Sequence, residues 1–407
     1  MPEKSILMKC IMILTKRKRY IWDYFVVLVF IFTTGTIVWF QYVTPGIAFI
    51  FFLIVAVVNC FIYKSRIPLG VKNKSFHYCL FVFFLCGLGM SFFYSSPKEN
   101  SIAGYLVAMF ASYLVISRYD FYYFRCLLTN VVFWIVLLGI PVFLLTEVDL
   151  LPLSVLHVSL DYEMFFIYSI GWPSHFGRFA GIWHEPGACQ IILNTILWLH
   201  IDEVRYWRWE KGQLIKLIVI LIGLILTFST GGYIVFLLFL CACVWKLPMK
   251  KRTRRWLYPL IIISFLCVIV AILNSETVYD KLFAEKTSVS KVSRTLDILA
   301  MWQMALERPY WGYGLGTIDF WKRSEELGNV ACSNGLIYGF ASMGFIWAFI
   351  FLSQVYRSIK RMNFSISPLW LFFAFLLLQS NERYLEFPIT FLFVFYFYSY
   401  NSVKYGK

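Results

Sequence analysis

Residues 16–40 read KRKRYIWDYFVVLVFIFTTGTIVWF, four basic residues followed by a long apolar stretch whose one charged residue is Asp23. A transmembrane helix needs about 20 predominantly apolar residues. Lys and Arg beside such a helix favour the cytoplasmic side of a membrane. The stretch therefore predicts a membrane helix that begins at the cytoplasmic face.

The same pattern recurs along the chain. Of its 407 residues, 60% are hydrophobic and 14% are charged, whereas soluble proteins carry roughly a quarter charged residues. This excludes a water-soluble enzyme and a disordered protein. The apolar stretches predict spans near residues 21–40, 45–63, 76–94, 101–117, 126–146, 187–201, 214–229, 231–245, 257–273, 333–353, 368–380 and 387–400. We expect an all-α polytopic membrane protein with about 12 transmembrane helices, in a single transmembrane domain over residues 1–407.

The charges give this domain an orientation. Most of the 37 Lys and Arg residues fall in the connections on the side of residues 16–19, whereas most of the 22 Asp and Glu residues fall on the other side. That asymmetry is typical of a multi-pass protein with both termini in the cytoplasm. The net charge of +15 then mainly reflects how the protein is oriented in the lipid bilayer. No nucleic-acid partner is expected.

Two outer connections are long, residues 147–186 and residues 274–332. Loops longer than about 15 residues are usually functional or disordered. Both loops mix Trp, Pro, Gly and charge in a way unlike a disordered tail. We expect two large ordered outer loops that carry the function.

In the first loop, residues 177–187 read GRFAGIWHEPG, and Arg178 is the one Lys or Arg of that loop. An Arg on the side where positive charge is sparse is not an orientation signal. It either pairs with a nearby carboxylate or forms part of a site. Glu185 precedes Pro186, a residue tolerated at the first position of a helix. Its carboxylate would lie at a positive helix end, which suits a helix cap or a general base.

The first loop also holds His157, His175 and His184. Their spacings match no compact metal motif, so ordinary polar loop residues are the favoured interpretation and no metal is expected. Between Leu156 and Met164, apolar and polar residues alternate as in a half-buried strand. The sequence indicates no partner for that strand.

In the second loop, Ser293–Glu307 reads SRTLDILAMWQMALE, which has the period of a helix. At 100° per residue, one face of that helix collects Arg294, Asp297, Met301 and Arg308 within about 60°. Two arginines on one stripe suit an anion clamp, and a solvated face neutralised by nearby carboxylates is the favoured alternative.

Residues 310–316, YWGYGLG, carry three alternating glycines. No strand precedes them and no helix is expected to follow directly, so they resemble a phosphate-binding glycine loop only superficially. A tight surface turn is the expected structure. Apart from Asp23 the spans contain essentially no charged residue. An ion-coupled carrier or a flippase with a charged cavity within the spans is therefore disfavoured.

Three segments together resemble a known family: GRFAGIWHEPG before a span, SRTLDILAMWQMALERPYWGYGLG in the second loop, and SNGLIYGFASMGFIWAFIF in the span that follows. They look like the O-antigen polymerase (Wzy) and O-antigen ligase superfamily of bacterial inner membranes. The resemblance implies a GT-C-like membrane glycosyltransferase of lipopolysaccharide biosynthesis. Such an enzyme works at the periplasmic face on a glycan donor and acceptor linked to undecaprenyl pyrophosphate, without a cofactor or an obligatory metal.

The resemblance also implies roles for particular residues. Planar arginine forks bind pyrophosphate oxygens well, so Arg178 and Arg294 would clamp the leaving group, with Arg308 as a third candidate. Glu185 would deprotonate the attacking sugar hydroxyl, with His184 as the rival base.

Polymerase and ligase differ in one expected feature. Ligases of this superfamily typically carry a functional His in the second large loop, and this chain has no His after His200. That favours a polymerase that extends lipid-linked repeat units over a ligase that transfers the glycan to lipid A core. By analogy with the family, a separate regulator of chain length is an expected partner.

Overall fold

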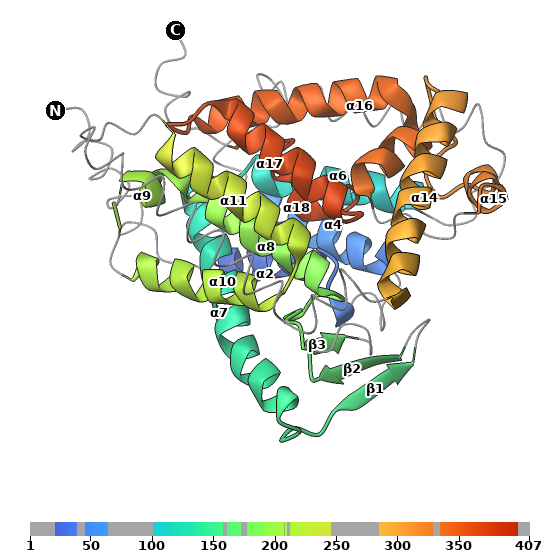
Figure 1. Cartoon of the computed structure of the whole chain (residues 1–407). Coiled ribbons are helices and arrows are strands. Elements are labelled where there is room, and N and C mark those ends of the chain that lie inside the picture. The colour runs from blue at the N-terminus through green and yellow to red at the C-terminus, as the bar shows by residue number, and fades with distance from the viewer. Residues whose placement is uncertain are drawn as a thin grey trace, which may run out of the picture.

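The computed structural model is mostly helical (Figure 1). It describes residues 21–38, 45–63, 101–157, 161–171, 177–206, 208–209, 212–245, 285–328 and 334–397. Two of the expected spans, residues 76–94 and 257–273, lie outside the described residues.

The expected first span, residues 21–40, is helical from Ile21 only up to Phe32, and a turn follows over residues 33–35. The remaining expected spans up to residue 381 coincide with helices, which confirms them as apolar helical segments. The helices are α2 (Ile21–Phe32), α4 (Pro45–Ile62), α6 (Ser101–Ile116), α7 (Phe121–Glu147), α8 (Pro186–Leu199), α9 (Ile201–Tyr206), α10 (Gln213–Leu226), α11 (Thr230–Val244), α14 (Glu285–Glu307), α15 (Ile318–Glu326), α16 (Gly335–Met362), α17 (Pro368–Asn381) and α18 (Pro388–Phe391). Among the described helices, α7 and α16 are long and apolar enough to cross a membrane by themselves.

Helix α8 lies at the centre of the bundle. All of its residues from Pro186 to Leu199 are buried, and it contacts α7, α10, α11 and α17 (Figure 1). A helix that is apolar around its whole circumference is stable only when neighbours cover every side. The two ends of α8 are therefore fixed by the surrounding helices.

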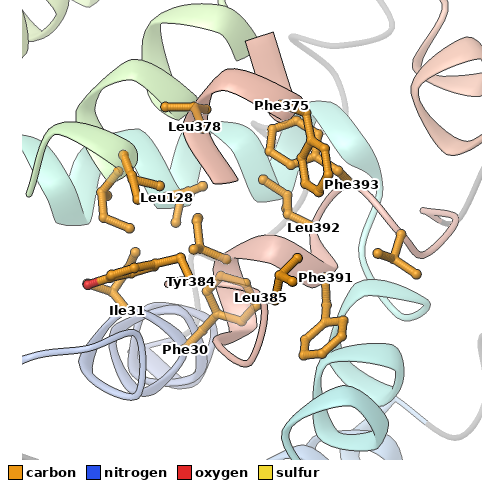
Figure 2. Packing of buried hydrophobic residues seen from close by; sticks show 14 of the residues in the cluster. Phe30, Ile31, Leu128, Phe375, Leu378, Tyr384, Leu385, Phe391, Leu392 and Phe393 are labelled. Atoms are coloured by element: carbon orange, nitrogen blue, oxygen red, sulfur yellow. The ribbon is translucent and has the colours of Figure 1, made fainter. Parts of the chain in front are cut away.

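A second packed region joins α2, α7 and α17 to the chain that follows α17 (Figure 2). Phe30 of α2 packs edge-on against Phe52 and Phe124. Tyr384 and Phe391, from the connection after α17 and from α18, lie in the same core.

The expected last span, residues 387–400, is wrong as a continuous helix. After the four-residue α18, the chain runs through turns up to residue 397, and residues 391–396 are buried. Polar side chains of α16 bind carbonyls that a helix would have satisfied. The bonds run from Gln354 Nε2 to Val394 O, 2.9 Å, and from Ser358 Oγ to Phe395 O, 2.9 Å. Irregular backbone among apolar helices is stable when the protein supplies such partners.

The first long loop contains a small antiparallel sheet, so the described fold is not purely α-helical. Its strands are β1 (Ser154–His157), β2 (Asp161–Phe165) and β3 (Tyr168–Gly171), in the order β1-β2-β3. Two paired strands, with Ser154 opposite Met164, replace the single strand expected from Leu156 to Met164. The missing partner is the neighbouring segment of the same loop.

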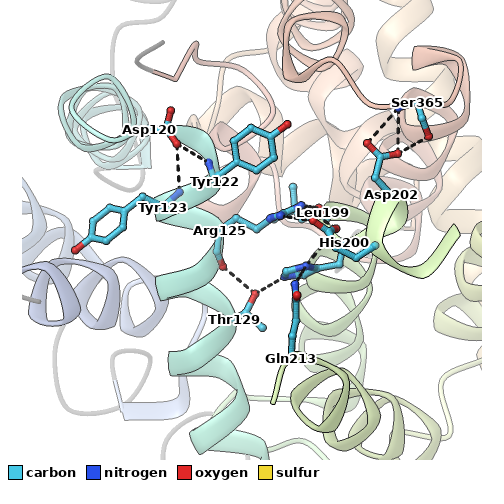
Figure 3. A network of polar contacts seen from close by, with 11 residues as sticks. Asp120, Tyr122, Tyr123, Arg125, Thr129, Leu199, His200, Asp202, Gln213 and Ser365 are labelled. Atoms are coloured by element: carbon cyan, nitrogen blue, oxygen red, sulfur yellow. Dashed lines mark hydrogen bonds and ion pairs between the residues drawn. The ribbon is translucent and has the colours of Figure 1, made fainter. Parts of the chain in front are cut away.

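Polar networks fasten the C-terminal end of α8 (Figure 3). Arg125 of α7 donates to Leu199 O (2.8 Å) and to both carboxylate oxygens of Glu203 in α9. His200 lies between Thr129 Oγ1 and Gln213 Nε2, each at 2.8 Å. Arg125 was expected just before a span, but α7 begins at Phe121 and includes it.

Asp23, the charge expected near a membrane interface, is completely buried. Its carboxylate accepts hydrogen bonds from Tyr63, Tyr119 and Tyr123, which belong to the ends of α4, α6 and α7. A buried carboxylate is stable when several donors surround it. The four segments are thereby held together at this end.

Residues 310–316 do not form the surface turn expected from their glycines, and α15 begins two residues after Gly316. They are largely buried against α16, which is kinked at Gly344 (φ 76°, ψ 172°). Hydrogen bonds between this loop and the kink replace helical ones, from Tyr313 N to Ala341 O (2.8 Å), Gly314 N to Ser342 O (2.7 Å) and Phe345 N to Pro309 O (2.7 Å). A side chain at Gly344 would overlap the Tyr310 backbone, so only glycine fits.

Candidate functional site

Arg178 lies in the segment that leads from the sheet into α8. It is 7% exposed, and its Nε donates to Thr227 O at the end of α10 (3.2 Å). The next residue, Phe179, donates its N–H to Leu226 O (2.8 Å). Backbone pairing thus holds the Arg178 guanidinium at the turn between α10 and α11.

This turn also begins helix α11. Ser229 caps that helix by accepting from Gly232 N (3.4 Å). A helix N-terminus carries a partial positive charge from its unpaired N–H groups. The arginine and the helix end therefore both favour negative charge at the same turn.

His184 and Glu185 form a pair directly before α8. The imidazole Nδ1 lies 3.0 Å from Gly35 O, and Nε2 lies 3.1 Å from Glu185 Oε1. Because both neighbouring atoms are hydrogen-bond acceptors, a protonated ring that donates from both nitrogens fits this geometry. The ring stacks on Tyr384, with planes 9° apart and centroids 6.3 Å apart.

The pKa of His184 reflects these neighbours. Burial disfavours the charged ring, but the Glu185 carboxylate and the Gly35 carbonyl outweigh burial and raise the pKa above its ordinary value. Since the side chains of His184 and Glu185 are 17% and 19% exposed, the pair is partly accessible. It can hold a proton and exchange it with a bound molecule.

Glu185 occupies the N-cap position of α8, and Pro186 follows at the start of the helix, as the sequence predicts. Its side chain makes no capping hydrogen bond to the helix. Glu185 therefore does not act as a helix cap, and the role of general base is the one that stays open to it. The carboxylate lies at the positive end of α8 and faces His184.

The connection after α17, NERYLEFP over residues 381–388, adds residues that sequence reasoning missed. The Glu382 side chain packs against Gly187 in the first turn of α8, and the Asn381 side chain packs against Gly231 in the first turn of α11. A methyl group at either glycine would overlap these side chains. The short polar run between two apolar stretches is the signal that could have identified it.

Helix α16 begins at the same place, because its first residue, Gly335, packs against the carbonyl of Glu382. The segment 381–384 thus lies among the N-termini of α8, α11 and α16. Converging helix N-termini favour anions. We call Arg178, His184, Glu185, Glu382 and Tyr384 the helix-end cluster.

Tyr384 connects the cluster to α2. Its ring is 1% exposed, and its hydroxyl packs against Gly35. Burial raises the pKa of this phenol well above its ordinary value, and the charges of Glu185 and Glu382 raise it further. Tyr384 is therefore a neutral phenol whose ring holds His184 in place.

The other two predicted arginines belong to the α14 region. Arg294 lies in α14, and its side chain is outside the described residues. Arg308 lies just after α14, with its guanidinium 4.2 Å from the centre of the Tyr313 ring and 3.9 Å from Asp319 Oδ2. The structure brings Arg178, His184 and Glu185 to neighbouring helix ends and places Arg308 on the connection to α15.

Within the described ranges, no group of three or more His, Cys, Asp and Glu side chains could hold a metal ion. The helix-end cluster instead combines an arginine, a histidine and two carboxylates with three helix N-termini. Such a set can bind an anionic group and move a proton beside it.

A family model described as O-antigen ligase (Wzy_C) matches residues 215–352. This part of the chain is therefore similar to a Wzy_C domain. It includes α10, α11, α14, α15 and the first part of α16, hence the turn that binds Arg178. Wzy_C proteins are polytopic membrane enzymes of the O-antigen ligase and polymerase type, which transfer glycans in surface polysaccharide biosynthesis. No curated protein and no solved structure matches the chain.

Proposed function

We propose that this Wzy_C protein is an O-antigen polymerase, which joins undecaprenyl-pyrophosphate-linked repeat units into O-antigen or a related surface polysaccharide. It would act at the periplasmic face of the bacterial inner membrane, as a multi-pass protein with both termini in the cytoplasm. The observation that carries the proposal is the His184–Glu185 pair at the N-terminus of α8. Glu382 connects this helix end to the N-terminus of α16, and Arg178 lies at the turn before α11.

The cluster supports a direct transfer. The hydroxyl of the acceptor glycan attacks the anomeric carbon of the donor, and the new glycosidic C–O bond forms as the bond to the pyrophosphate oxygen breaks. Glu185 accepts the hydroxyl proton, and His184 holds that carboxylate in place. The departing undecaprenyl pyrophosphate takes the electron pair, and Arg178 with the helix N-termini stabilises its negative charge.

Arg294 is the second arginine of the proposed clamp, and Arg308 is the third candidate. The face of α14 that carries Arg294 by helical period also carries Asp297 and Met301, both buried. Helix α14 packs against α16, and the N-terminus of α16 adjoins Glu382 of the helix-end cluster. An arginine on α14 could therefore approach the pyrophosphate from the second loop.

A ligase that transfers the glycan to lipid A core is the second candidate, and the description of the matching family favours it. Against it stands the lack of any His after His200 in the sequence. A lipid-linked oligosaccharide flippase would need charged residues along a central cavity. Helix α8, at the centre of the described bundle, has no charged residue between Pro186 and Leu199.

A deletion strain separates the three functions. Loss of a polymerase leaves lipid A core with a single repeat unit on a gel, loss of a ligase leaves bare core, and loss of a flippase traps units on the inner face. We expect the single-unit band. Bare core would contradict the polymerase proposal.

A further inference from the structure

The C-terminal half of α14 is apolar around most of its circumference. One face, with Ala300, Met301, Met304 and Ala305, is buried, and α14 packs against α16. That contact accounts for only one side of the helix.

The adjoining side is apolar and exposed. Ile298, Leu299, Trp302 and Leu306 are 38%, 58%, 42% and 57% exposed. At 3.6 residues per turn these four side chains fall within about 100° of one another. We call them the α14 stripe. A contiguous apolar stripe of this kind is unfavourable in water and marks a contact with lipid or with a partner.

The stripe continues into the exposed side of α16. The Trp302 ring lies 6.4 Å from the Phe340 ring and 6.0 Å from the Phe345 ring, one on each side of the kink at Gly344. One turn beyond Phe345, Phe349 is 75% exposed. Helix α16 is one of the described helices that are apolar and long enough to cross a membrane, and acyl chains are favourable surroundings for an exposed side chain such as Phe349.

A polar edge borders the stripe on one side. Gln303 donates to Glu307 (3.0 Å), and Arg323 of α15 binds both carboxylate oxygens of Glu307, at 2.5 and 3.0 Å. Hydrogen bonding from Arg323 lowers the pKa of Glu307 to about 2, despite a small opposing effect of burial. The carboxylate is therefore ionised and needs a polar environment.

Taken together, α14 has an apolar stripe continuous with a membrane-crossing helix and an ionic edge shared with α15. This is the pattern of a helix that lies in the membrane interface. Aromatic side chains favour that depth, and Trp302, Tyr310 and Trp311 are all exposed here.

We infer that the C-terminal half of α14 is a membrane-interfacial helix whose stripe contacts the acyl chains of bilayer lipids. The inference does not depend on which glycan the protein transfers. It assigns the second long loop a lipid-binding surface, so that loop is anchored in the bilayer beside α16.

Photocrosslinking of the full chain tests this inference. The photoreactive residue p-benzoylphenylalanine is introduced singly in place of Leu299, Leu306, Phe349 or Glu325, and each protein is placed in nanodiscs of phosphatidylethanolamine and phosphatidylglycerol. Phe349 is the lipid-facing control on α16, and exposed Glu325 on α15 is the water-facing control. All four positions are exposed, so the substitutions leave the packed core unchanged.

After irradiation, intact mass spectrometry counts phospholipid adducts. We expect adduct yields at 299 and 306 that approach the yield at 349 and exceed the yield at 325 several-fold. Yields at 299 and 306 no higher than at 325, with adducts present at 349, would overturn the inference. Crosslinks at 299 and 306 to a second copy of the chain or to another protein, in place of lipid, would overturn it too.

Discussion

Helix α8 carries a histidine and a glutamate at each end, and the two ends differ in what surrounds them. At the C-terminal end, His200 is 1% exposed, its ring nitrogens contact Thr129 and Gln213, and its Nδ1 also lies 3.6 Å from Glu203 Oε2. Arg125 binds both carboxylate oxygens of Glu203. At the N-terminal end, the His184–Glu185 pair is partly exposed and directly precedes α8, whose first turn packs against Glu382.

Under the proposed function, the same residue types serve two purposes. Arg125 and His200 are fixed around Glu203 between α7, α9 and α10, and these polar contacts hold the three helices together. The Glu185 carboxylate lies at a helix end that it does not cap and contacts His184. Partial exposure and a positive environment are what a proton-accepting group beside an anion needs.

The sharpest test of this comparison is to neutralise one glutamate at a time. We expect Glu185→Gln to reduce chain extension by roughly 100- to 10,000-fold, the usual contribution of a general base. Glu203→Gln should keep normal activity per folded molecule. The measurement is the O-antigen ladder after complementation of a deletion strain, normalised to protein level. A full ladder from Glu185→Gln would remove the base from the proposed mechanism.

Removing the arginine of the cluster should have the next largest effect. Arg178→Ala, and likewise Arg294→Ala, should lower activity by roughly 100- to 1,000-fold, the usual loss when one group that stabilises transition-state charge is deleted. Arg178→Lys should rescue poorly, because a lysine lacks the planar fork. Activity and protein level are measured together. Full activity of Arg178→Ala at normal abundance would contradict the clamp.

A change of a single methyl group tests the packing of the cluster. Gly187→Ala should push the Glu382 side chain away from α8 and lower activity roughly tenfold to a hundredfold by misplacing neighbouring groups. Gly46→Ala is the matched control, because it also lies in the first turn of a helix and has open space around it. Equal activity of the two variants would show that the position of Glu382 does not matter.

The smallest expected effect concerns stability at the other end of α8. Burial opposes ionisation of Glu203, but the His200 hydrogen bond and the Arg125 charge outweigh it and lower the pKa of this carboxyl from 4.5 to about 2. Ionised Glu203 therefore stabilises the fold above its ordinary pKa, and this contribution is lost as the pH falls towards 2. The difference in Tm between wild type and Glu203→Gln should be largest near neutral pH and shrink between pH 5 and 2. A difference in Tm that stays constant with pH would contradict this stabilising role of ionised Glu203.

The helices could be predicted because apolar composition and length identify segments that avoid water. The irregular stretch at 391–397 could not, because Gln354 and Ser358, about 40 residues earlier in the chain, satisfy its carbonyls. The packing of residues 310–316 against the kink in α16 could not be predicted either, because the local spacing of glycines does not reveal a distant partner.

The candidate site could be predicted where its residues are neighbours in the sequence. Glu185 and Pro186 formed a local pattern that predicted the start of α8. The pairing of Glu185 with His184, which the sequence offered only as the rival base, is seen in the structure. Glu382 and Tyr384 reach the cluster only through the packing of α17 and its following connection against α8 and α2. That contact depends on tertiary structure, so the sequence marks residues 381–388 as a polar run between apolar stretches but does not show where they pack.

The most direct test of the central claim uses purified full-length protein and a defined undecaprenyl-pyrophosphate oligosaccharide, with the products sized. We predict that wild type and Glu203→Gln convert it into a ladder of added repeat units without any lipid A core, and that Glu185→Gln and Arg178→Ala do not. A wild-type protein that makes no ladder until lipid A core is added would contradict polymerisation. A ladder from Glu185→Gln would contradict the helix-end cluster as the place where it occurs.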